Sequence, residues 1–198
     1  MGSRLSRCTG RPQQPAYEVS LNGIDGGTIH VEPDNNPYSA ANIECVRRMW
    51  RLKVLPNASS YMPKALLKAA DHSKVIEQVM FNSEQALHET DRRNAVASLA
   101  KRITEFITDE LQLVANDDIE LAQEKAFQLG RDHVHFGGQR SFTPIYWDIF
   151  LLAVLETLVD VRVTPSEAAA FHMFMTKLVI NMRAGYEAGR SERRSCEQ

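Results

Sequence analysis

The 198-residue chain lacks several features that would place it in other classes of protein. It has no run of about 18 consecutive apolar residues, so the sequence predicts no membrane-spanning helix. No apolar stretch near its start would act as a secretory signal. Its three cysteines, Cys8, Cys45 and Cys196, are odd in number and far apart. This argues against a disulfide framework and favours a reducing cytoplasm. A formal net charge of -2 gives no indication of nucleic-acid binding.

Apolar residues make up 43% of the chain, which is enough for a complete core. They recur at helical spacings over most of residues 38–189, where we expect an all-α domain. Residues 1–37 hold four prolines and five glycines and little helical periodicity, so they are expected to form a flexible extension. The charged tail at 190–198 is expected to be disordered.

The most informative stretch runs from Leu129 to Gly137 and closes a helical run that begins near Asp117. His133 lies one turn beyond Leu129 on the apolar stripe of this helix. The pair Gly137-Gly138 is typical of a helix C-terminus. A buried imidazole near a helix end suits an axial ligand of a flat apolar cofactor, while its second nitrogen bonds a backbone carbonyl one turn back. The alternative interpretation is a core histidine satisfied by the backbone.

Two further helices are expected after this stretch. Residues 142–158 are strongly apolar, and Thr164-Pro165-Ser166-Glu167 predicts a capped start for a long helix that runs to Gly185-Tyr186. Near the other end of the domain, residues 39–53 predict a first helix that carries Trp50 on its apolar side.

The order and spacing of these features resemble the globin family over about residues 38–189. The resemblance is carried by Leu129-Gly-x-x-His133-x-x-x-Gly137, by Thr164-Pro165-x-Glu167 and by Trp50 at the position of the first-helix tryptophan. It implies the globin fold, in which helices A to H form a 3-over-3 sandwich, with haem b as cofactor and His133 as the proximal iron ligand. It also implies a set of residues that line the haem pocket, namely Phe81, Leu99, Ile103, Leu129 and Leu67, and two arginines near the propionates, Arg131 and Arg140.

The distal side departs from the family's pattern. Fitting the apolar stripe of residues 84–114 to globins puts either Ala95 or Leu99 where the family usually carries histidine or glutamine, and neither donates a hydrogen bond. His88 offers a second solution, because it lies seven and eleven residues before these positions, on the same helical face. It would then be a second axial ligand of the iron. The alternative is an exposed histidine in a polar connector.

The first residues, Met-Gly-Ser-Arg-Leu-Ser, match the pattern for N-myristoylation at Gly2. Cys8 is close enough to be palmitoylated, and three arginines without an acid among them accompany it: Arg4, Arg7 and Arg11. One myristoyl chain gives only marginal attachment to a membrane, and a second chain with basic residues makes it durable. The alternative is a chance match.

These features lead to one main functional hypothesis and two alternatives. We expect a haem globin that acts in electron transfer, or in sensing oxygen or nitric oxide, at the cytoplasmic face of a membrane. Its partners would be diatomic ligands or a redox protein, and one-electron or nitrite chemistry is left open, since no dedicated catalytic constellation is present. The alternatives are an oxygen-storage globin and a haemless globin-fold scaffold. The remaining histidines are assigned no chemistry: His30, His72, His135 and His172.

Overall fold

The computed structural model describes residues 35–81, 89–136 and 142–196, and over these ranges the chain forms helices and short connections without any strand. They belong to one compact unit, Val31–Gln198. The predicted all-α class is therefore confirmed for the part of the chain described. Nearly all of the predicted extension at residues 1–37 lies outside it.

Seven α-helices follow one another in these residues, with short 3-10 or π-helical turns at some of their ends. Their bounds are α1 (Ala40–Met49), α2 (Ala58–His72), α3 (Lys74–Phe81), α4 (Glu89–Ala115), α5 (Ile119–Asp132), α6 (Ile145–Leu158) and α7 (Pro165–Cys196). A π-helical turn, Trp50–Val54, and a 3-10 turn, Leu55–Asn57, continue α1 directly into α2.

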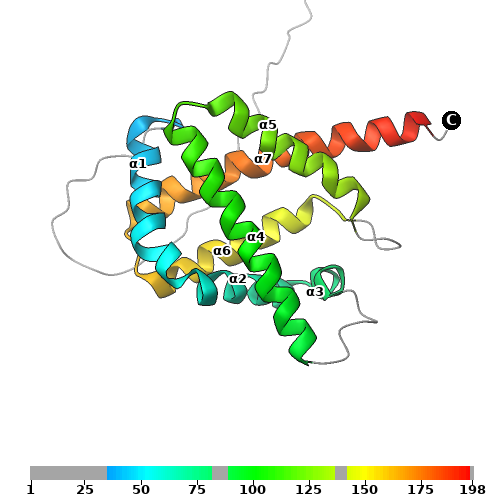
Figure 1. Cartoon of the computed structure of the whole chain (residues 1–198), viewed down its shortest axis with the longest axis horizontal. Helices are drawn as coiled ribbons and strands as arrows, with labels where there is room; N and C mark the ends of the chain where they lie inside the picture. Colours follow the sequence, from blue (N-terminus) through cyan, green and yellow to red (C-terminus); the bar gives the residue numbers. More distant parts are fainter. Residues whose placement is uncertain (1–34, 82–88, 137–141, 197–198) are drawn as a thin grey trace, which may run out of the picture. The chain divides into compact units, whose positions relative to one another are not determined.

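The helices pack across one another around a single main core. Helix α2 packs against both α4 and α6, and α1 packs against α4 and α7. Helices α5 and α7 lie side by side and run in the same direction, while α4 crosses in front of α6 and α2 (Figure 1). The C-terminal end of α5, where His133 follows, is therefore held against the long last helix.

Helix α1 forms where the apolar spacing predicted it. The Ser39 hydroxyl accepts a hydrogen bond from the Asn42 backbone at 3.3 Å, which caps the first turn. The predicted apolar side of the helix is buried along its whole length: Ile43, Val46, Met49, Trp50 and Val54. The indole N–H of Trp50 donates to the Thr108 hydroxyl at 3.0 Å and so joins α1 to α4.

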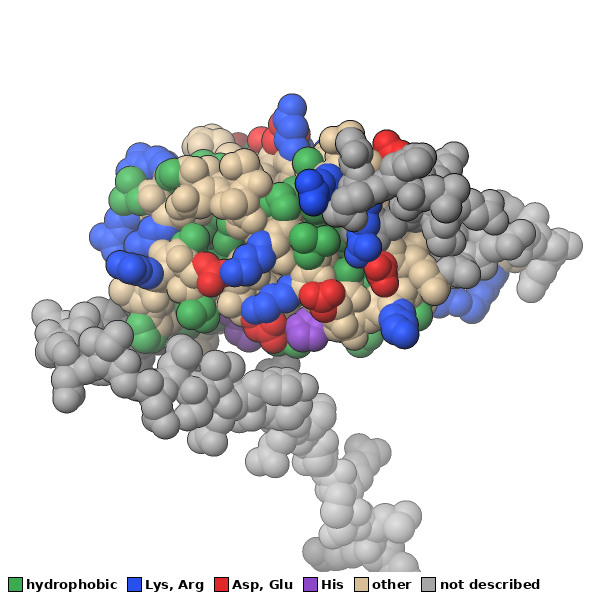
Figure 2. All heavy atoms as spheres, turned by 90° about the horizontal axis from the view of Figure 1, so that it is seen from below, with side chains coloured by type: hydrophobic (Ala, Val, Ile, Leu, Met, Phe, Trp, Pro, Cys, Tyr) green, Lys and Arg blue, Asp and Glu red, His purple; other side chains and the backbone are tan. Residues whose placement is uncertain are grey.

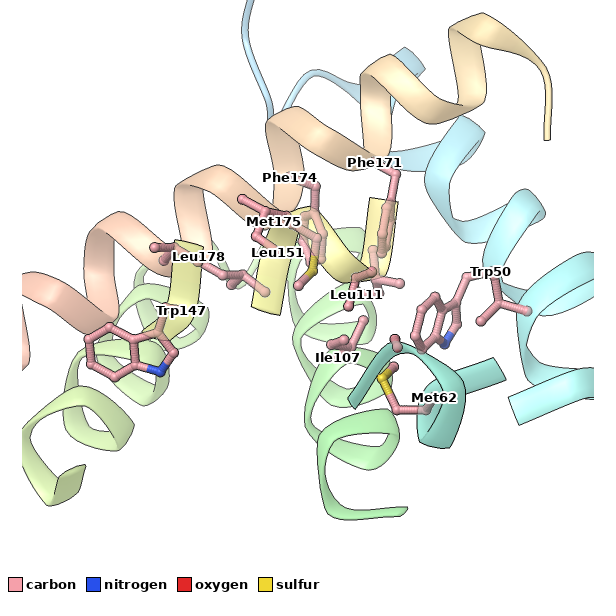
Figure 3. Close-up of a cluster of buried hydrophobic side chains, with 14 of the residues drawn as sticks. Trp50, Met62, Ile107, Leu111, Trp147, Leu151, Phe171, Phe174, Met175 and Leu178 are labelled. Carbon is pink, nitrogen blue, oxygen red and sulfur yellow. The ribbon is translucent and has the colours of Figure 1, made fainter. Parts of the chain in front are cut away.

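The core brings together side chains from α1, α2, α4, α6 and α7 (Figure 3). Trp50 stacks on Phe171 with ring centroids 5.8 Å apart. The interpretation of Trp50 as a packing residue is therefore confirmed. The largest fully buried side chains around this stack include Met62, Ile107, Phe174 and Leu178. Burying a side chain of this size contributes about 1.5–3 kcal/mol, so the core dominates the stability of the fold.

The predicted cap of α7 is confirmed. The Thr164 backbone N–H donates to Glu167 Oε2 at 2.7 Å, and the Glu167 N–H donates to the Thr164 hydroxyl at 3.3 Å. Burial alone would raise the pKa of Glu167. The ion pair with Lys53 at 2.6 Å and the bond from Thr164 outweigh that effect and lower the pKa. A charged Glu167 therefore fastens the start of α7 to the end of α1.

The structure differs from the expected ends of two helices. The tail predicted to be disordered at 190–198 is helical as far as Cys196. Its Ser191 and Ser195 hydroxyls bond carbonyls one turn back, and Glu192 pairs with Arg131, so side chains support the added turns. The second helix also starts before Pro63, where a proline in the first turn would have been expected: the preceding 3-10 turn leads into the helix from Ala58, so Pro63 lies inside α2.

Two leucines that the sequence placed on buried faces are exposed. Leu67 on α2 was expected beside a ligand pocket, and Leu121 on α5 was expected on the apolar stripe. On α5 the buried face is made of small residues instead, Ala122, Ala126 and Gly130. The apolar spacing of α5 had the correct period, but the predicted buried face was wider than the observed one. Small residues at spacings of four are enough to pack α5 against its neighbours.

Candidate functional site

His133 follows the last residue of α5 and opens a 3-10 turn that ends at His135. Its backbone N–H still bonds the carbonyls of the last turn of α5, including that of Leu129. The imidazole is therefore held at a helix end, as the sequence predicted. The Gly137-Gly138 pair that was expected to end the helix lies outside the described residues.

The imidazole of His133 is fixed by one short hydrogen bond. Its Nδ1 lies 2.6 Å from the Leu129 carbonyl oxygen, so Nδ1–H is the donor. This is the bond one turn back that the sequence analysis predicted, and it assigns the remaining lone pair to Nε2. No hydrogen-bond partner of Nε2 is found among the residues that the structure describes.

Three aromatic rings surround the imidazole. Phe136 stacks on it with centroids 5.0 Å apart, and Phe142 and Trp147 meet it edge-on at 4.8 and 5.3 Å. These rings come from the connection after α5 and from the start of α6. Phe142 and Trp147 are buried, whereas Phe136 is 54% exposed, so the imidazole has aromatic neighbours on its buried side and on its solvent side.

Burial lowers the pKa of His133 below its usual value. The hydrogen bond to the Leu129 carbonyl and the nearby Asp132 carboxylate act in the opposite direction, but they do not outweigh burial. The side chain is therefore neutral at pH 7. A neutral imidazole with a free Nε2 lone pair is the form that binds a metal ion.

The aromatic shell is itself tied to α7. The Tyr186 hydroxyl donates to the Phe142 carbonyl at 2.5 Å, and the Tyr186 ring meets Trp147 edge-on at 6.1 Å. The Phe142 N–H donates in turn to the Phe136 carbonyl at 3.3 Å and closes the connection between α5 and α6. Tyr186 on α7 thereby holds Phe142 and Trp147 in place beside the imidazole of His133.

Glycines bring α5 and α7 into direct backbone contact beside His133. A Cβ atom at Gly130 would lie 1.8 Å from the Met182 carbonyl oxygen, and one at Gly185 would lie 1.8 Å from that of Phe127. Only glycine fits at either position. The glycine in Leu129-Gly130-x-x-His133 is therefore required by packing three residues before the candidate ligand.

The other predicted pocket residues are only partly placed by the structure. Leu99, Ile103 and Leu129 are half-buried and pack against the main core, which also contains Phe142 and Trp147. Ala95, the other candidate for the distal position, is exposed. Phe81 ends α3 but nothing is described of its side chain. The remaining predicted site residues lie outside the described residues: His88, Arg140, Gly2 and Cys8.

The remaining candidates on the described part of the chain have other surroundings. Arg131, a proposed propionate partner, pairs with Glu192, and His135 is exposed. His72 lies 3.1 Å from Glu156 at the surface, and His172 is exposed on α7. Within the described ranges, no group of three or more His, Cys, Asp or Glu side chains could hold a metal ion by itself.

Sequence reasoning missed Phe142 and Trp147 as neighbours of His133, and it missed a buried acid. Glu110 on α4 is fully buried, and neither carboxyl oxygen has a hydrogen-bond partner in the described part of the chain. Burial raises its pKa to about 7, with a smaller rise from Asp109 and a reduction from Lys125. The signal was present, because Glu110 continues the apolar stripe of Ile103 and Ile107.

The chemistry of the donor at this site fits a haem iron. A neutral imidazole whose Nδ1–H bonds a backbone carbonyl and whose Nε2 is free is the form in which histidine binds a haem iron. Comparison with models of known protein families gave no match, and neither did comparison with curated proteins. Over the described helices, none is both long enough and apolar enough to cross a membrane.

Proposed function

We propose that this protein is a haem-binding globin that acts in electron transfer or in sensing oxygen or nitric oxide at a membrane. The single observation that supports the proposal best is the hydrogen bond from His133 Nδ1 to the Leu129 carbonyl, 2.6 Å long, which leaves Nε2 free. A histidine buried only for packing usually has a polar partner for both nitrogens. In this chain Nδ1 of His133 donates to the Leu129 carbonyl, Nε2 is free, and aromatic rings surround the imidazole.

The order and packing of the helices support a globin fold as part of this proposal. A first helix packed on the last one, a second helix packed against both α4 and α6, and a candidate ligand after α5 fit the family's arrangement. Seven α-helices lie in the described residues, one fewer than helices A to H.

Haem bound at this site would supply one-electron exchange at its iron and reversible binding of diatomic ligands. His133 would bind the iron through Nε2 and keep its orientation through Leu129. The buried rings of Phe142 and Trp147 would shield that bond from water, which favours the neutral imidazole over its protonated form. Leu99 and Ile103 would supply apolar contacts from α4. His88, which directly precedes α4, remains the candidate for a second axial ligand.

The proposed site at the membrane follows from the sequence. Myristoylation of Gly2 and palmitoylation of Cys8 would place the domain at the cytoplasmic face, where a redox partner or a signalling protein is met. Both residues lie far along the chain from α1, so acylation leaves the haem site and its helices free to act.

Absorption spectroscopy of the purified full chain, titrated with haem b, tests the proposal. We expect a Soret band at one haem per chain, and we expect His133→Ala to lose it or to shift it, because the axial nitrogen is removed. His172→Ala is the matched control, since that histidine is also helical but exposed, and it should leave the spectrum unchanged. A low-spin spectrum that becomes high-spin in His88→Ala would identify the second ligand.

A chain that is folded by circular dichroism but gives no Soret band would contradict the proposal and favour the haemless scaffold. An unchanged spectrum in His133→Ala would show that another residue holds the iron. A stable oxygen complex with five-coordinate iron would favour oxygen storage.

A further inference from the structure

One corner of the domain joins two connections that are far apart in the sequence. The turn Leu55–Asn57 before α2 meets the turn Val159–Val161 before α7, and both border a hollow of about 470 Å³. Polar and charged side chains line it from both connections: Asn57, Ser60, Lys64, Asp160 and Arg162. The hollow lies away from His133, which does not line it.

Exposed apolar side chains flank this hollow. Leu52 is 60% exposed, Leu55 is 36% exposed and Val159 is 70% exposed. Leu55 is two residues from Asn57, and Val159 is next to Asp160, so these apolar side chains come from the same two turns that form the hollow. Several exposed aliphatic side chains gathered at one corner indicate an interaction surface more strongly than isolated ones do.

Positive charge surrounds the same corner. Arg48 precedes Leu52 by four residues and Arg51 precedes Leu55 by four, and all four side chains are exposed. Figure 2 shows lysine and arginine side chains gathered at the left end of the molecule, where α1 lies in Figure 1, with apolar side chains among them.

These arginines are not neutralised by neighbouring acids. Within the described residues, no ion pair involves Arg48, Arg51 or Arg162. The nearby acids already have partners, since Glu44 pairs with Arg47, Asp160 with Lys64 and Glu167 with Lys53. The corner is therefore cationic at neutral pH, and its charge is available to a partner.

We propose that this basic-apolar corner, formed by Arg48, Arg51, Leu52, Leu55, Val159 and Arg162, docks on the surface of an anionic phospholipid bilayer. The arginines would meet lipid phosphates, and the three aliphatic side chains would enter the boundary between headgroups and acyl chains. A protein partner that matched the arginines would need acidic side chains, whereas a bilayer satisfies cations and exposed aliphatic groups together. This inference rests on the membrane location in the proposed function, but it does not depend on haem.

Binding of the full-length Gly2→Ala protein to sedimented vesicles tests the inference without acylation at that residue. We expect it to bind vesicles of phosphatidylcholine with 30 mol% phosphatidylserine, as a test composition, and to bind pure phosphatidylcholine weakly. Each cation near a charged surface strengthens binding about fivefold, so Arg48→Gln, Arg51→Gln and Arg162→Gln together should weaken it at least about tenfold. A control with Lys74→Gln, Arg102→Gln and Arg194→Gln removes the same charge from exposed sites elsewhere and should bind nearly as well.

The apolar contribution has its own test. Leu52→Ser with Val159→Ser should weaken binding to the anionic vesicles several-fold, whereas Leu121→Ser, at an exposed leucine on α5, should not. Equal binding to neutral vesicles, or equal loss in the control triple, would overturn the inference. So would full competition by inorganic phosphate at matched ionic strength, which would identify a soluble anion as the ligand. Loss of the Soret band in any variant bears on the haem site and leaves this result unaffected.

Discussion

At the scale of single residues, His133 and Glu110 illustrate opposite solutions for a buried titratable group. His133 has one nitrogen bonded to the Leu129 carbonyl and is neutral because burial lowers its pKa. Glu110 has no hydrogen-bond partner for either oxygen within the described residues, and burial raises its pKa to about 7. The free Nε2 of His133 is able to bind a ligand, whereas ionisation of Glu110 destabilises the fold.

Glu110 makes the stability of the domain depend on pH. Because its pKa is raised in the folded chain to about 7, its protonated form favours folding below pH 4.5, and this contribution is lost as the pH rises to about 7. The loss should be about 3 kcal/mol. We expect Glu110→Gln to abolish it, so the difference between the two proteins in urea unfolding should grow from pH 4.5 to pH 7.5. Parallel stability profiles would mean that Glu110 titrates normally in the folded chain.

The residue scale also marks a limit of sequence analysis. The bond of His133 to a carbonyl one turn back is a property of one helix, and its spacing predicted it. Phe142 and Trp147 are held beside the imidazole by the bond from the Phe142 N–H to the Phe136 carbonyl and by the bond from Tyr186 to the Phe142 carbonyl. No local pattern encodes a contact that depends on the closure of a connection and on a distant helix.

At the scale of helices, local sequence signals predicted where helices begin better than they predicted which helices contact one another. The cap at Thr164 and Glu167 and the buried side of α1 depend on neighbours within a turn, and both are as expected. The extension of α7 to Cys196 was not predicted, because Arg131 on α5 supplies the partner for Glu192. The tight contact of α5 with α7 was missed for the same reason, since it requires Gly130 to face Met182 on α7 and Gly185 to face Phe127 on α5.

Gly130 provides a test of that contact. Gly130→Ala should lower the free energy of unfolding by at least about 2 kcal/mol, because the new Cβ would meet a backbone oxygen that cannot turn away. Gly189→Ala on α7 is the control, since its Cβ would meet Val134 Cγ2 at 2.9 Å, Arg131 Cγ at 3.1 Å and the Arg131 carbonyl oxygen at 3.3 Å, which requires a much smaller shift than the 1.8 Å contact at Gly130. The better helix propensity of alanine offsets that cost by up to about 1 kcal/mol. Thermal and urea unfolding measure both, and equal effects would mean that the helices separate easily at Gly130.

At the scale of the whole molecule, composition and periodicity predicted the all-helical class and the domain that begins near residue 38. They left the globin arrangement as a proposal, because several orders of crossing helices satisfy the same apolar stripes. The described core starts with Tyr38, which packs against it and whose pKa burial raises to about 12. Residues 1–34 lie outside the described ranges.

Removal of residues 1–34 should therefore leave the thermal midpoint and the haem stoichiometry of the domain unchanged. Tyr38→Ala in the shortened chain should lower the midpoint, by about 2–4 °C for each kcal/mol of packing lost. Calorimetry and absorption spectra of the two chains measure both effects. A shortened chain that unfolds several degrees earlier would mean that the first 34 residues contribute to the core.

The absence of side chains between α5 and α7 at Gly130 and Gly185 has a mechanical consequence. Two helices whose backbones touch cannot slide past each other without a collision, so they move as one rigid body. A shift of His133 along the axis of α5, such as a change at the proposed iron site would impose, must then carry α7 with it. The C-terminal end of α7, at Cys196, would then move when the group bound to Nε2 of His133 changes.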